Sequence, residues 1–192
     1  ATAGVMRAYI ESGLTNREPV SRLFTTGPMF RYERPQKGRM RQFHQINCEC
    51  LGSHSPMADA ELVSMLLRFL SDLGLTDLTL KINSLGCSEC RPKFKAALLE
   101  YLAGVDKDAL CPDCARRVET NPLRVLDCKQ PGCRAITDNA PKLIDYNCPE
   151  CRAHFDTVLE LLQVQGLAFE LDHRLVRGLD YYTNTVFEFI SN

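Results

Sequence analysis

The sequence predicts an α+β fold, with an antiparallel sheet flanked by helices and a mainly helical, cysteine-rich insertion. Three observations support this prediction. Residues 28–33 and 43–51 alternate between apolar and polar side chains on either side of a basic loop, which is typical of a β-hairpin. Apolar residues recur at helical spacing after Pro56 and around Phe155. Eight of the ten cysteines fall between residues 87 and 151, where they form four spaced pairs.

The overall composition is that of an ordinary globular protein. The 192-residue chain is 45% hydrophobic and 24% charged, with a formal net charge of −1. No apolar run approaches the roughly 20 residues that span a bilayer. We therefore expect a cytoplasmic protein with neither a membrane nor DNA as a partner, and any RNA contact would need a local basic patch. Because the chain begins without Met and ends directly after an expected strand, it is expected to be a piece of a longer protein.

Helices and a short strand are predicted on both sides of the hairpin. Residues 1–12 have apolar side chains at helical spacing and end at Gly13, which predicts a short helix. A second helix is predicted to begin near Pro56 and to end at Gly74, with an apolar face typical of core packing. The alternation at residues 78–82 predicts a strand. The apolar face of the second helix comprises Leu62, Leu66, Phe69, Leu70 and Leu73.

The two faces of the predicted hairpin differ in chemistry. Successive side chains of a strand point to opposite faces, so Arg31 and Glu33 share one face of the first arm. The opposite, apolar face is expected to be buried, with Cys48 and Cys50 as core residues. On the second arm the mixed polar face comprises Phe43, Gln45, Asn47 and Glu49, and the apolar face of the hairpin comprises Phe30, Tyr32, Ile46 and Cys48. The mixed polar face is predicted to be a recognition surface.

The loop between the arms, residues 34–41, is strongly basic. From Arg31 to Gln45 there are five cations and one anion, a local net charge of +4 in a chain whose total is −1. Guanidinium and ammonium groups bind phosphate oxygens, so the loop would concentrate anionic ligands. A solvated, charged hairpin tip is the alternative interpretation. The mixed polar face beside the loop favours ligand binding.

Two stretches of the chain resemble one known family. The string GPMFRYERPQKGRMRQFHQ, in residues 27–52, resembles motif 2 of the class II aminoacyl-tRNA synthetases and is similar above all to the histidyl-tRNA synthetases. The string LVRGLDYYTNTVFEF, at residues 175–189, resembles the histidine-specific motif of the same family. The resemblance covers essentially the whole chain and implies a class II synthetase-type antiparallel sheet. It also implies that motif 1 precedes this chain and that motif 3 and the anticodon-binding domain follow it.

The resemblance implies a reaction and a set of site residues. A homodimeric parent protein would form histidyl-adenylate from histidine and ATP with Mg²⁺, and would then transfer the histidyl group to tRNA(His). The piece alone is expected to be inactive. Arg31 and Arg177 are the implied catalytic residues, on opposite sides of the ATP α-phosphate. The implied ATP-binding residues are Arg31, Glu33, Arg39 and Phe43, and the implied histidine-binding residues are Thr2, Gln45, Glu49, Arg177, Tyr181 and Tyr182.

The same resemblance divides the chain into three parts. Residues 1–83 are expected to form the first part of the catalytic core, and residues 167–192 its second part. Residues 84–166 are expected to form the insertion domain peculiar to histidyl-tRNA synthetases, which is thought to help hold the tRNA acceptor stem.

The four cysteine pairs predict structural metal sites. A Cys-x-x-Cys pair presents two thiolates to one tetrahedral cation, and two pairs complete a closed zinc site. The first two pairs have 20 residues between them, which fits well, but 13 and 14 residues separate the later neighbours, so three pairings stay open. All-sulfur coordination is expected, with His154 on a helix face instead. The pairs are Cys87 with Cys90, Cys111 with Cys114, Cys128 with Cys133, and Cys148 with Cys151.

Other interpretations compete with these. Disulfides would require an oxidising compartment, and unpaired buried thiols would not explain four spaced pairs. For the whole chain, one alternative is the synthetase-like regulatory subunit of ATP phosphoribosyltransferase. The presence of Arg31, Arg177, Tyr181 and Tyr182 disfavours such a non-catalytic relative. A zinc-stapled RNA-binding module is the other alternative, and it leaves the mixed polar face of the hairpin unexplained.

Overall fold

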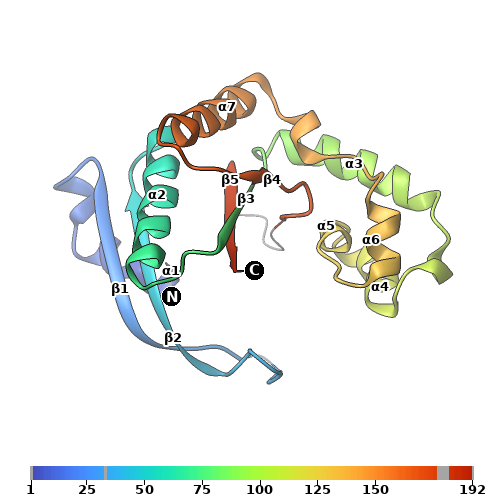
Figure 1. Cartoon of the computed structure of the whole chain (residues 1–192), viewed down its shortest axis with the longest axis horizontal. Helices are drawn as coiled ribbons and strands as arrows, with labels where there is room; N and C mark the ends of the chain where they lie inside the picture. Colours follow the sequence, from blue (N-terminus) through green and yellow to red (C-terminus); the bar gives the residue numbers. More distant parts are fainter. Residues whose placement is uncertain (1, 33, 177–181, 192) are drawn as a thin grey trace. The chain divides into compact units, whose positions relative to one another are not determined.

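The computed structural model describes residues 2–32, 34–176 and 182–191. The chain divides into two compact units, residues 1–58 and residues 59–192, and each is described by itself. Figure 1 shows the elements of both units along the chain. Among the described residues, no helix has both the length and the apolar character that crossing a membrane requires.

The first unit consists of a helix and a long β-hairpin. Helix α1 (Thr2–Glu11) is followed by Gly13 with a φ of 67°, and by a short 3-10 helix, η1 (Leu14–Asn16). Strands β1 (Ser21–Phe30) and β2 (Gln42–Leu51) are antiparallel and pair along their whole length. The first strand thus begins seven residues earlier than predicted. The reason is the register, because Leu51 at the end of β2 requires a partner as early as Ser21.

The burial of the two hairpin faces is the reverse of the prediction. The mixed polar face, with Phe43, Gln45, Asn47 and Glu49, is half-buried, whereas the apolar face is largely exposed. Phe30 is 75% exposed and Ile46 is 56% exposed. Cys48 is also exposed, so its prediction as a core residue was wrong, and Cys50 is only partly buried. A two-stranded sheet buries only what another element covers, and no described element of this unit covers the apolar face.

The second unit is built on a three-stranded sheet with the order β4-β3-β5. Strand β3 (Leu78–Ser84) is antiparallel to β5 (Thr185–Ser191) and parallel to the short β4 (Glu170–Leu171). Helices α2 (Pro56–Asp72) and α7 (Pro149–Val164) pack against one face of this sheet (Figure 1). Their shared core comprises Ala60, Val63, Leu80, Ile82, Phe155, Val158 and Leu162.

The other face of this sheet is more polar. Lys81 lies opposite Glu188 in the antiparallel register, between the inward-facing Leu80 and Ile82. Alternation along the strand sends one set of side chains to the helices and the other set away from them. The sequence therefore buries one face of the sheet against α2 and α7 and keeps charges for the other.

Between β3 and α7 the chain forms a set of short helices with a core of their own. The helices are α3 (Cys90–Ala103), η2 (Lys107–Ala109), α4 (Pro112–Thr120), α5 (Leu123–Leu126), α6 (Pro131–Thr137) and η3 (Leu143–Tyr146). Phe94 and Leu98 of α3 are fully buried, and Phe94 meets the ring of Tyr146 edge-on at 5.7 Å. Leu85, Leu175 and Val186 join the same core, so it is continuous with the ends of the sheet strands.

The core of the helix-sheet layer predicts a clear difference between two phenylalanines. Phe155 is 1% exposed between α7 and the sheet, whereas Phe69 of α2 is 40% exposed. We expect Phe155→Ala to lower the free energy of unfolding by about 3–5 kcal/mol, because it leaves a cavity in a packed layer. Phe69→Ala, the matched control, should cost about 1 kcal/mol or less. Urea unfolding measures both, and equal losses would contradict the assignment of the core.

Candidate functional site

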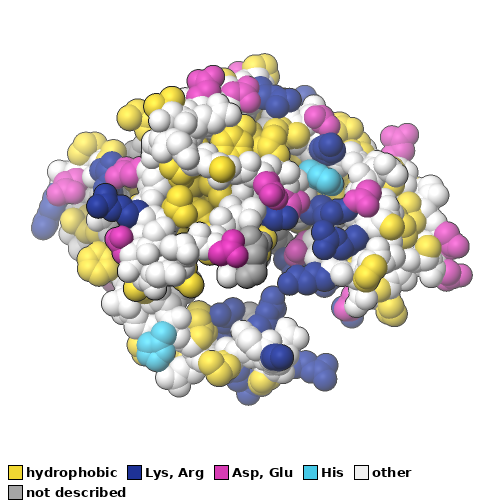
Figure 2. Space-filling view, in the orientation of Figure 1, with side chains coloured by type: hydrophobic (Ala, Val, Ile, Leu, Met, Phe, Trp, Pro, Cys, Tyr) yellow, Lys and Arg dark blue, Asp and Glu magenta, His cyan; other side chains and the backbone are white. Residues whose placement is uncertain are grey.

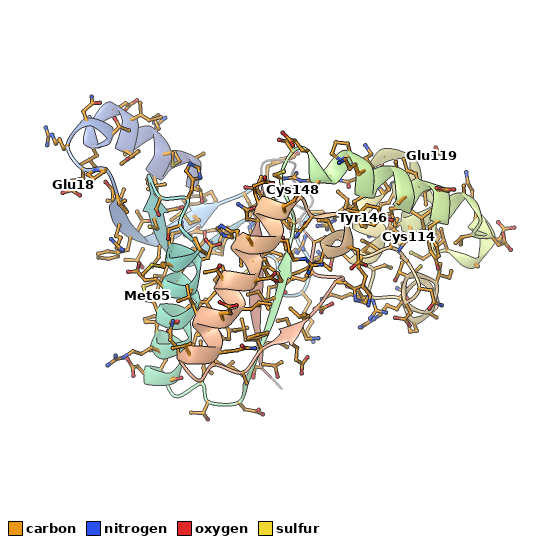
Figure 3. All side chains as sticks on the ribbon, turned by 90° about the horizontal axis from the view of Figure 1, so that it is seen from above. Glu18, Met65, Cys114, Glu119, Tyr146 and Cys148 are labelled. Carbon is orange, nitrogen blue, oxygen red and sulfur yellow. The ribbon has the colours of Figure 1, made fainter. Side chains whose placement is uncertain are left out.

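The eight clustered cysteines form two groups of four in the second unit. Cys87 and Cys90 meet Cys148 and Cys151 in the first group, and Cys111, Cys114, Cys128 and Cys133 form the second group. In each group the sulfur atoms lie within 4.8 Å of one another. Of the three pairings that the sequence left open, the structure selects the one that joins the first pair with the last. Figure 3 labels Cys148 and Cys114, one from each group, at separate places in the fold.

The same local motif builds one half of each group. The strings Cys111-Pro112-Asp113-Cys114 and Cys148-Pro149-Glu150-Cys151 both begin a helix, with the first Cys as the N-cap and Pro as the first helical residue. Proline suits this position because its missing N–H would have no helical partner. The second Cys then falls in the first turn, near the first. Each motif thus fixes two thiols by local sequence alone.

The first group joins the end of β3 to the start of α7. The Sγ atoms of Cys87 and Cys90 are 3.5 Å apart, and the backbone N–H of Cys148 donates to the Sγ of Cys90 at 3.1 Å. Gly86 has a φ of 58°, and a Cβ placed there would lie 2.7 Å from the Cβ of Cys90. A glycine is therefore required where the chain enters this group.

The second group lies among the short helices. The Sγ atoms of Cys111 and Cys128 are 3.9 Å apart, and the backbone N–H of Cys111 donates to the Sγ of Cys133 at 3.2 Å. Cys114 is fully buried and Cys133 is 1% exposed. The group is thus part of the core of the helical segment.

The pKa values of the thiols differ within each group. The backbone N–H groups of Cys90 and Glu89 lower the pKa of Cys87 to about 7. The backbone N–H of Cys114 lowers the pKa of Cys111 to about 7. Burial has the opposite effect on Cys114 and Cys151, where it raises the thiol pKa. Backbone donors favour a thiolate at one position, while a bound cation would offset the cost of burying the others.

Both groups fit a tetrahedral thiophilic metal ion. Zinc bound by four thiolates at about 2.3 Å would place the sulfur atoms about 3.8 Å apart, close to the separations of 3.5 and 3.9 Å found here. His154 belongs to neither group. Its Nε2 lies 2.9 Å from the Oδ2 of Asp59, so its side chain has a partner on another helix, as expected of a residue on a helix face. Four sulfur ligands leave no open position for a substrate, so the groups suit a structural rather than a catalytic metal.

The mixed polar face of the hairpin brings together several predicted site residues. Met29 pairs with Phe43 and Gly27 with Gln45, and the N–H of Arg31 donates to the carbonyl of Arg41 at 2.9 Å. The Cζ of Arg31 lies 3.7 Å from the centroid of the Phe43 ring, in cation–π contact. Arg31, Phe43, Gln45 and Glu49 therefore share one face of the hairpin, because they come from every second residue pair along it.

Three buried polar atoms on this face, the Oγ of Ser21, the Oγ1 of Thr25 and the Nδ2 of Asn47, have no hydrogen-bond partner among the described residues. Thr25 and Asn47 are directly opposite each other, and the Oγ1 of Thr25 and the Nδ2 of Asn47 are both buried and unsatisfied. Sequence analysis placed Asn47 on this face but did not select Thr25. Alternation along β1 would have found it, had the strand been extended back to Ser21.

The basic loop forms an exposed turn. The N–H of Gln36 donates to the carbonyl of Arg39 at 3.1 Å, and the reverse bond measures 2.8 Å. Arg34, Lys37, Arg39 and Arg41 are all exposed. Figure 2 shows basic side chains gathered over the tip of the hairpin. This arrangement can attract an anionic ligand to the end of the mixed polar face.

The predicted site also includes Thr2, Glu33, Arg177, Tyr181 and Tyr182. Glu33, Arg177 and Tyr181 lie outside the described residues. Thr2 is exposed in the first turn of α1. Tyr182 is 42% exposed, and its carbonyl accepts a hydrogen bond from the Nη2 of Arg91. Sequence analysis gave Arg91 no role, and no sequence signal marks it.

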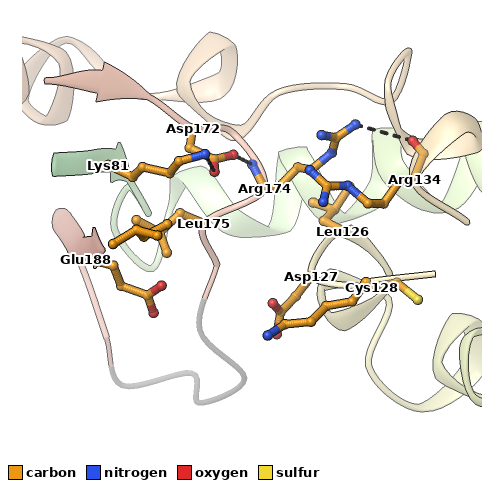
Figure 4. Close-up of a pocket in the computed structure, with 11 residues that line it drawn as sticks. Lys81, Leu126, Asp127, Cys128, Arg134, Asp172, Arg174, Leu175 and Glu188 are labelled. Carbon is orange, nitrogen blue, oxygen red and sulfur yellow. Dashed lines mark hydrogen bonds and ion pairs between the residues drawn. The ribbon is translucent and has the colours of Figure 1, made fainter. Parts of the chain in front are cut away.

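A cavity of about 210 Å³ lies beside the polar face of the three-stranded sheet. Lys81 and Glu188 line it from the sheet, and Arg134 lines it from α6 (Figure 4). Much of its charge is already paired: Lys81 lies 3.4 Å from Asp172, and Arg174 forms an ion pair with Asp138. Among the predicted site residues that the structure describes, only Cys128 lines this cavity.

The family profile and similar curated proteins point to the same family. The profile described as histidyl-tRNA synthetase matches residues 1–192. A histidine–tRNA ligase of Nitratidesulfovibrio vulgaris is 68% identical over the whole chain, which covers 46% of that relative. One from Oleidesulfovibrio alaskensis is 61% identical over 99% of the chain, again 46% of the relative. The chain therefore spans somewhat less than half the length of these curated relatives.

Solved structures agree with the sequence comparisons. The structure of apo histidyl-tRNA synthetase from S. aureus matches 98% of this chain and 43% of its own, with a TM-score of 0.72 and 35% identity. A protein from Bacillus halodurans described as an ATP phosphoribosyltransferase regulatory subunit/histidyl-tRNA synthetase matches with a TM-score of 0.63 at 19% identity. The second match shows only a shared fold. The predicted α+β architecture with a cysteine-rich helical segment is confirmed.

Proposed function

Because this chain belongs to the histidyl-tRNA synthetase family, we propose that the protein containing it activates histidine with ATP and transfers the histidyl group to tRNA(His). The observation that carries the proposal is the shared face of Arg31, Phe43, Gln45 and Glu49 on the hairpin. It offers one cation, one aromatic ring and two polar side chains side by side. These groups suit a nucleotide phosphate, an adenine ring and a polar amino acid.

Each residue has a proposed part in the first step. The carboxylate of histidine attacks the α-phosphorus, and Arg31 and Arg177 stabilise the charge that grows on the phosphate oxygens. Phe43 stacks on the adenine, Glu33 accepts from its amino group, and Arg39 binds the phosphates. The Arg31 guanidinium lies over one face of the Phe43 ring. Adenine would stack there once Arg31 has turned to the phosphate, or it would use the opposite face.

The histidine pocket would use polar partners. Gln45 and Glu49 lie on one face of β2, where their side-chain oxygens can accept hydrogen bonds from the ammonium or imidazole N–H groups of the substrate. Thr2, Tyr181 and Tyr182 are proposed to complete the pocket, with Arg177. An analogue without these polar groups would leave the partners unpaired, which favours discrimination.

The remaining parts of the proposal rest on the family. Mg²⁺ would accompany the ATP phosphates, the whole protein would be a cytoplasmic homodimer, and residues 84–166 would form an insertion between two parts of a catalytic core, residues 1–83 and 167–192. The exposed basic loop and the cysteine-containing helical segment are available for contacts to tRNA. We also propose a structural zinc ion in each four-cysteine group.

Two alternatives remain distinguishable by experiment. A regulatory subunit related to the synthetases would bind ligands without forming an adenylate. A zinc-containing RNA-binding module would retain its metals and would show no exchange that depends on an amino acid. Histidine-dependent exchange of pyrophosphate into ATP therefore separates the synthetase from both.

The catalytic assignment predicts the behaviour of Arg177→Ala. We expect the full-length protein to catalyse histidine-dependent pyrophosphate exchange, and Arg177→Ala to reduce the rate by about 100-fold or more, because one cation is lost from the transition state. Arg7→Ala, in an exposed ion pair of α1, is the control and should change the rate by about twofold or less. Normal exchange in Arg177→Ala would overturn its assignment.

Stacking on the adenine predicts a change in the KM for ATP. We expect Phe43→Ala to raise this KM about tenfold, because base–aromatic stacking contributes about 1–3 kcal/mol. The KM for histidine should stay nearly unchanged. Phe24→Ala, on the exposed opposite face of β1, is the matched control and should have no effect on either constant. A Phe43→Ala variant with an unchanged KM for ATP would contradict the stacking role.

The metal proposal predicts stoichiometry. We expect two zinc ions per chain from the two four-cysteine groups, measured by elemental analysis of the purified protein. Cys114→Ser should lose one of them, because it removes a fully buried ligand of the second group. Cys48→Ser, an exposed cysteine outside both groups, should lose none. Less than one equivalent of zinc, with all thiols reacting freely, would refute the proposal.

A further inference from the structure

The first four-cysteine group is connected to two parts of the predicted histidine-specific motif, residues 175–189. Residues 83–91, which include Cys87 and Cys90, make hydrogen bonds to Leu175 at the start of the motif and to Tyr182 and Asn184 within it. Residues 177–181 lie outside the described part of the chain. One short stretch of sequence thus contacts the motif on either side of residues 177–181 and also supplies two of the four sulfurs.

The contact at the start of the motif is buried. The Nδ2 of Asn83, a residue that is 4% exposed, donates to the carbonyl of Leu175 at 3.1 Å. Leu175 and Val176 are buried in the same core as Leu85. The end of β3 therefore fixes the chain as it enters the motif.

The contacts at Asn184, within the motif, extend the pairing of β3 with β5 toward the first group. Beyond the pair Ser84–Thr185, the N–H of Leu85 donates to the carbonyl of Asn184 at 2.6 Å, and the N–H of Asn184 donates to the carbonyl of Gly86 at 2.9 Å. The next residue, Cys87, belongs to the four-cysteine group. The ladder of hydrogen bonds therefore ends beside this group.

Side chains reinforce this connection. The Sγ of Cys151 lies 3.5 Å from the Oδ1 of Asn184, and the Nη2 of Arg91 donates to the carbonyl of Tyr182. Asn184 has a φ of 54°, a conformation in which Asn and Gly are favoured. The second half of the group is also connected to β3: the Nδ2 of Asn147, the residue before Cys148, donates to the Oγ of the fully buried Ser84 at 2.8 Å.

Among the described residues, the cysteines of the second group make no hydrogen bond to residues 175–189, although three of them share a buried core with Leu175 and Val186. Its four cysteines lie in or beside α4, α5 and α6, and the hydrogen bonds to their sulfur atoms come from within that segment. The two groups, although alike in composition, have different surroundings.

We propose that a metal ion in the first four-cysteine group positions Tyr182 and the start of β5, and thereby sets the affinity for histidine. Arg91 and Asn184 are the positioning residues, since they connect the metal-binding stretch to the motif without contacting substrate. The inference deepens the proposed function and rests on it for the identity of the substrate. The second group would stabilise the helical segment alone.

Kinetics of the full-length protein test the positioning residues. Arg91→Ala should raise the KM for histidine about tenfold in pyrophosphate exchange, with the KM for ATP and the zinc content unchanged, as is typical when a supporting contact is lost. Arg116→Ala is the matched control, because Arg116 makes an exposed ion pair with Asp113 in α4. A KM for histidine in Arg91→Ala equal to that of the unaltered protein would overturn the proposal.

Substitutions at Asn184 separate backbone position from general stability. Asn184→Gly tolerates the positive φ and should keep a KM for histidine within about threefold of the unaltered protein. Asn184→Ala strains the turn and should raise this KM about tenfold. Equal constants for the two variants would show that the turn does not position the motif.

Hydrogen exchange gives a readout that does not depend on activity. The amides of Leu85 and Asn184 are the reporters, because each donates across the end of the sheet. Cys148→Ser, which breaks the first group, should speed their exchange about tenfold or more, while Cys128→Ser, in the second group, should leave it unchanged. Equal effects of the two variants would overturn the proposal.

Different results would contradict the proposed function and the positioning role of the first group. If the unaltered full-length protein shows no histidine-dependent exchange, the proposed function is wrong, whatever the amides report. If that exchange is normal but the Leu85 and Asn184 amides ignore the first group, the positioning role is wrong and the function stands. Should Cys148→Ser unfold entirely, Arg91→Ala and Asn184→Ala still decide, because both retain all eight thiols.

Discussion

Convergence of four sulfur atoms, from two segments 58 residues apart, is the constraint on which the second unit depends. Cys87 and Cys90 follow β3, while Cys148 and Cys151 open α7. Bringing these thiols together fixes where the inserted helices leave the sheet and where they return to it. Thiolates repel one another, so a cation among them is the natural way to stabilise the arrangement.

The packing of two helices on one face of the sheet is the second feature that organises this unit. Helices α2 and α7 come from opposite sides of the inserted helices in sequence, yet they cover the same face of the sheet. The other face retains Lys81 and Glu188 and a cavity lined by charged side chains. When only one face of a sheet is buried, apolar side chains are expected on that face, against the helices, and polar side chains on the other.

The hairpin unit differs in which of its faces is buried. Its mixed polar face is half-buried, although it contains Gln45, Asn47 and Glu49, and its apolar face is exposed. Burial of unsatisfied polar atoms at Thr25 and Asn47 costs free energy unless a partner binds them. Sequence patterns assume that apolar residues are buried, and this assumption fails for the hairpin, whose polar side chains are more buried than its apolar ones.

The sequence by itself determined the family motifs, most helices and the four spaced cysteine pairs, because these depend on local strings, periodicity and residue chemistry. Only the tertiary structure decided how the cysteine pairs combine. Closing the chain between Cys90 and Cys148 rather than between Cys90 and Cys111 costs only about 1 kcal/mol more in loop entropy, so spacing could not discriminate between them. The contacts of Arg91 with Tyr182 and of Asn184 with Cys151 likewise join residues that lie 91 and 33 positions apart in sequence, which no local pattern records.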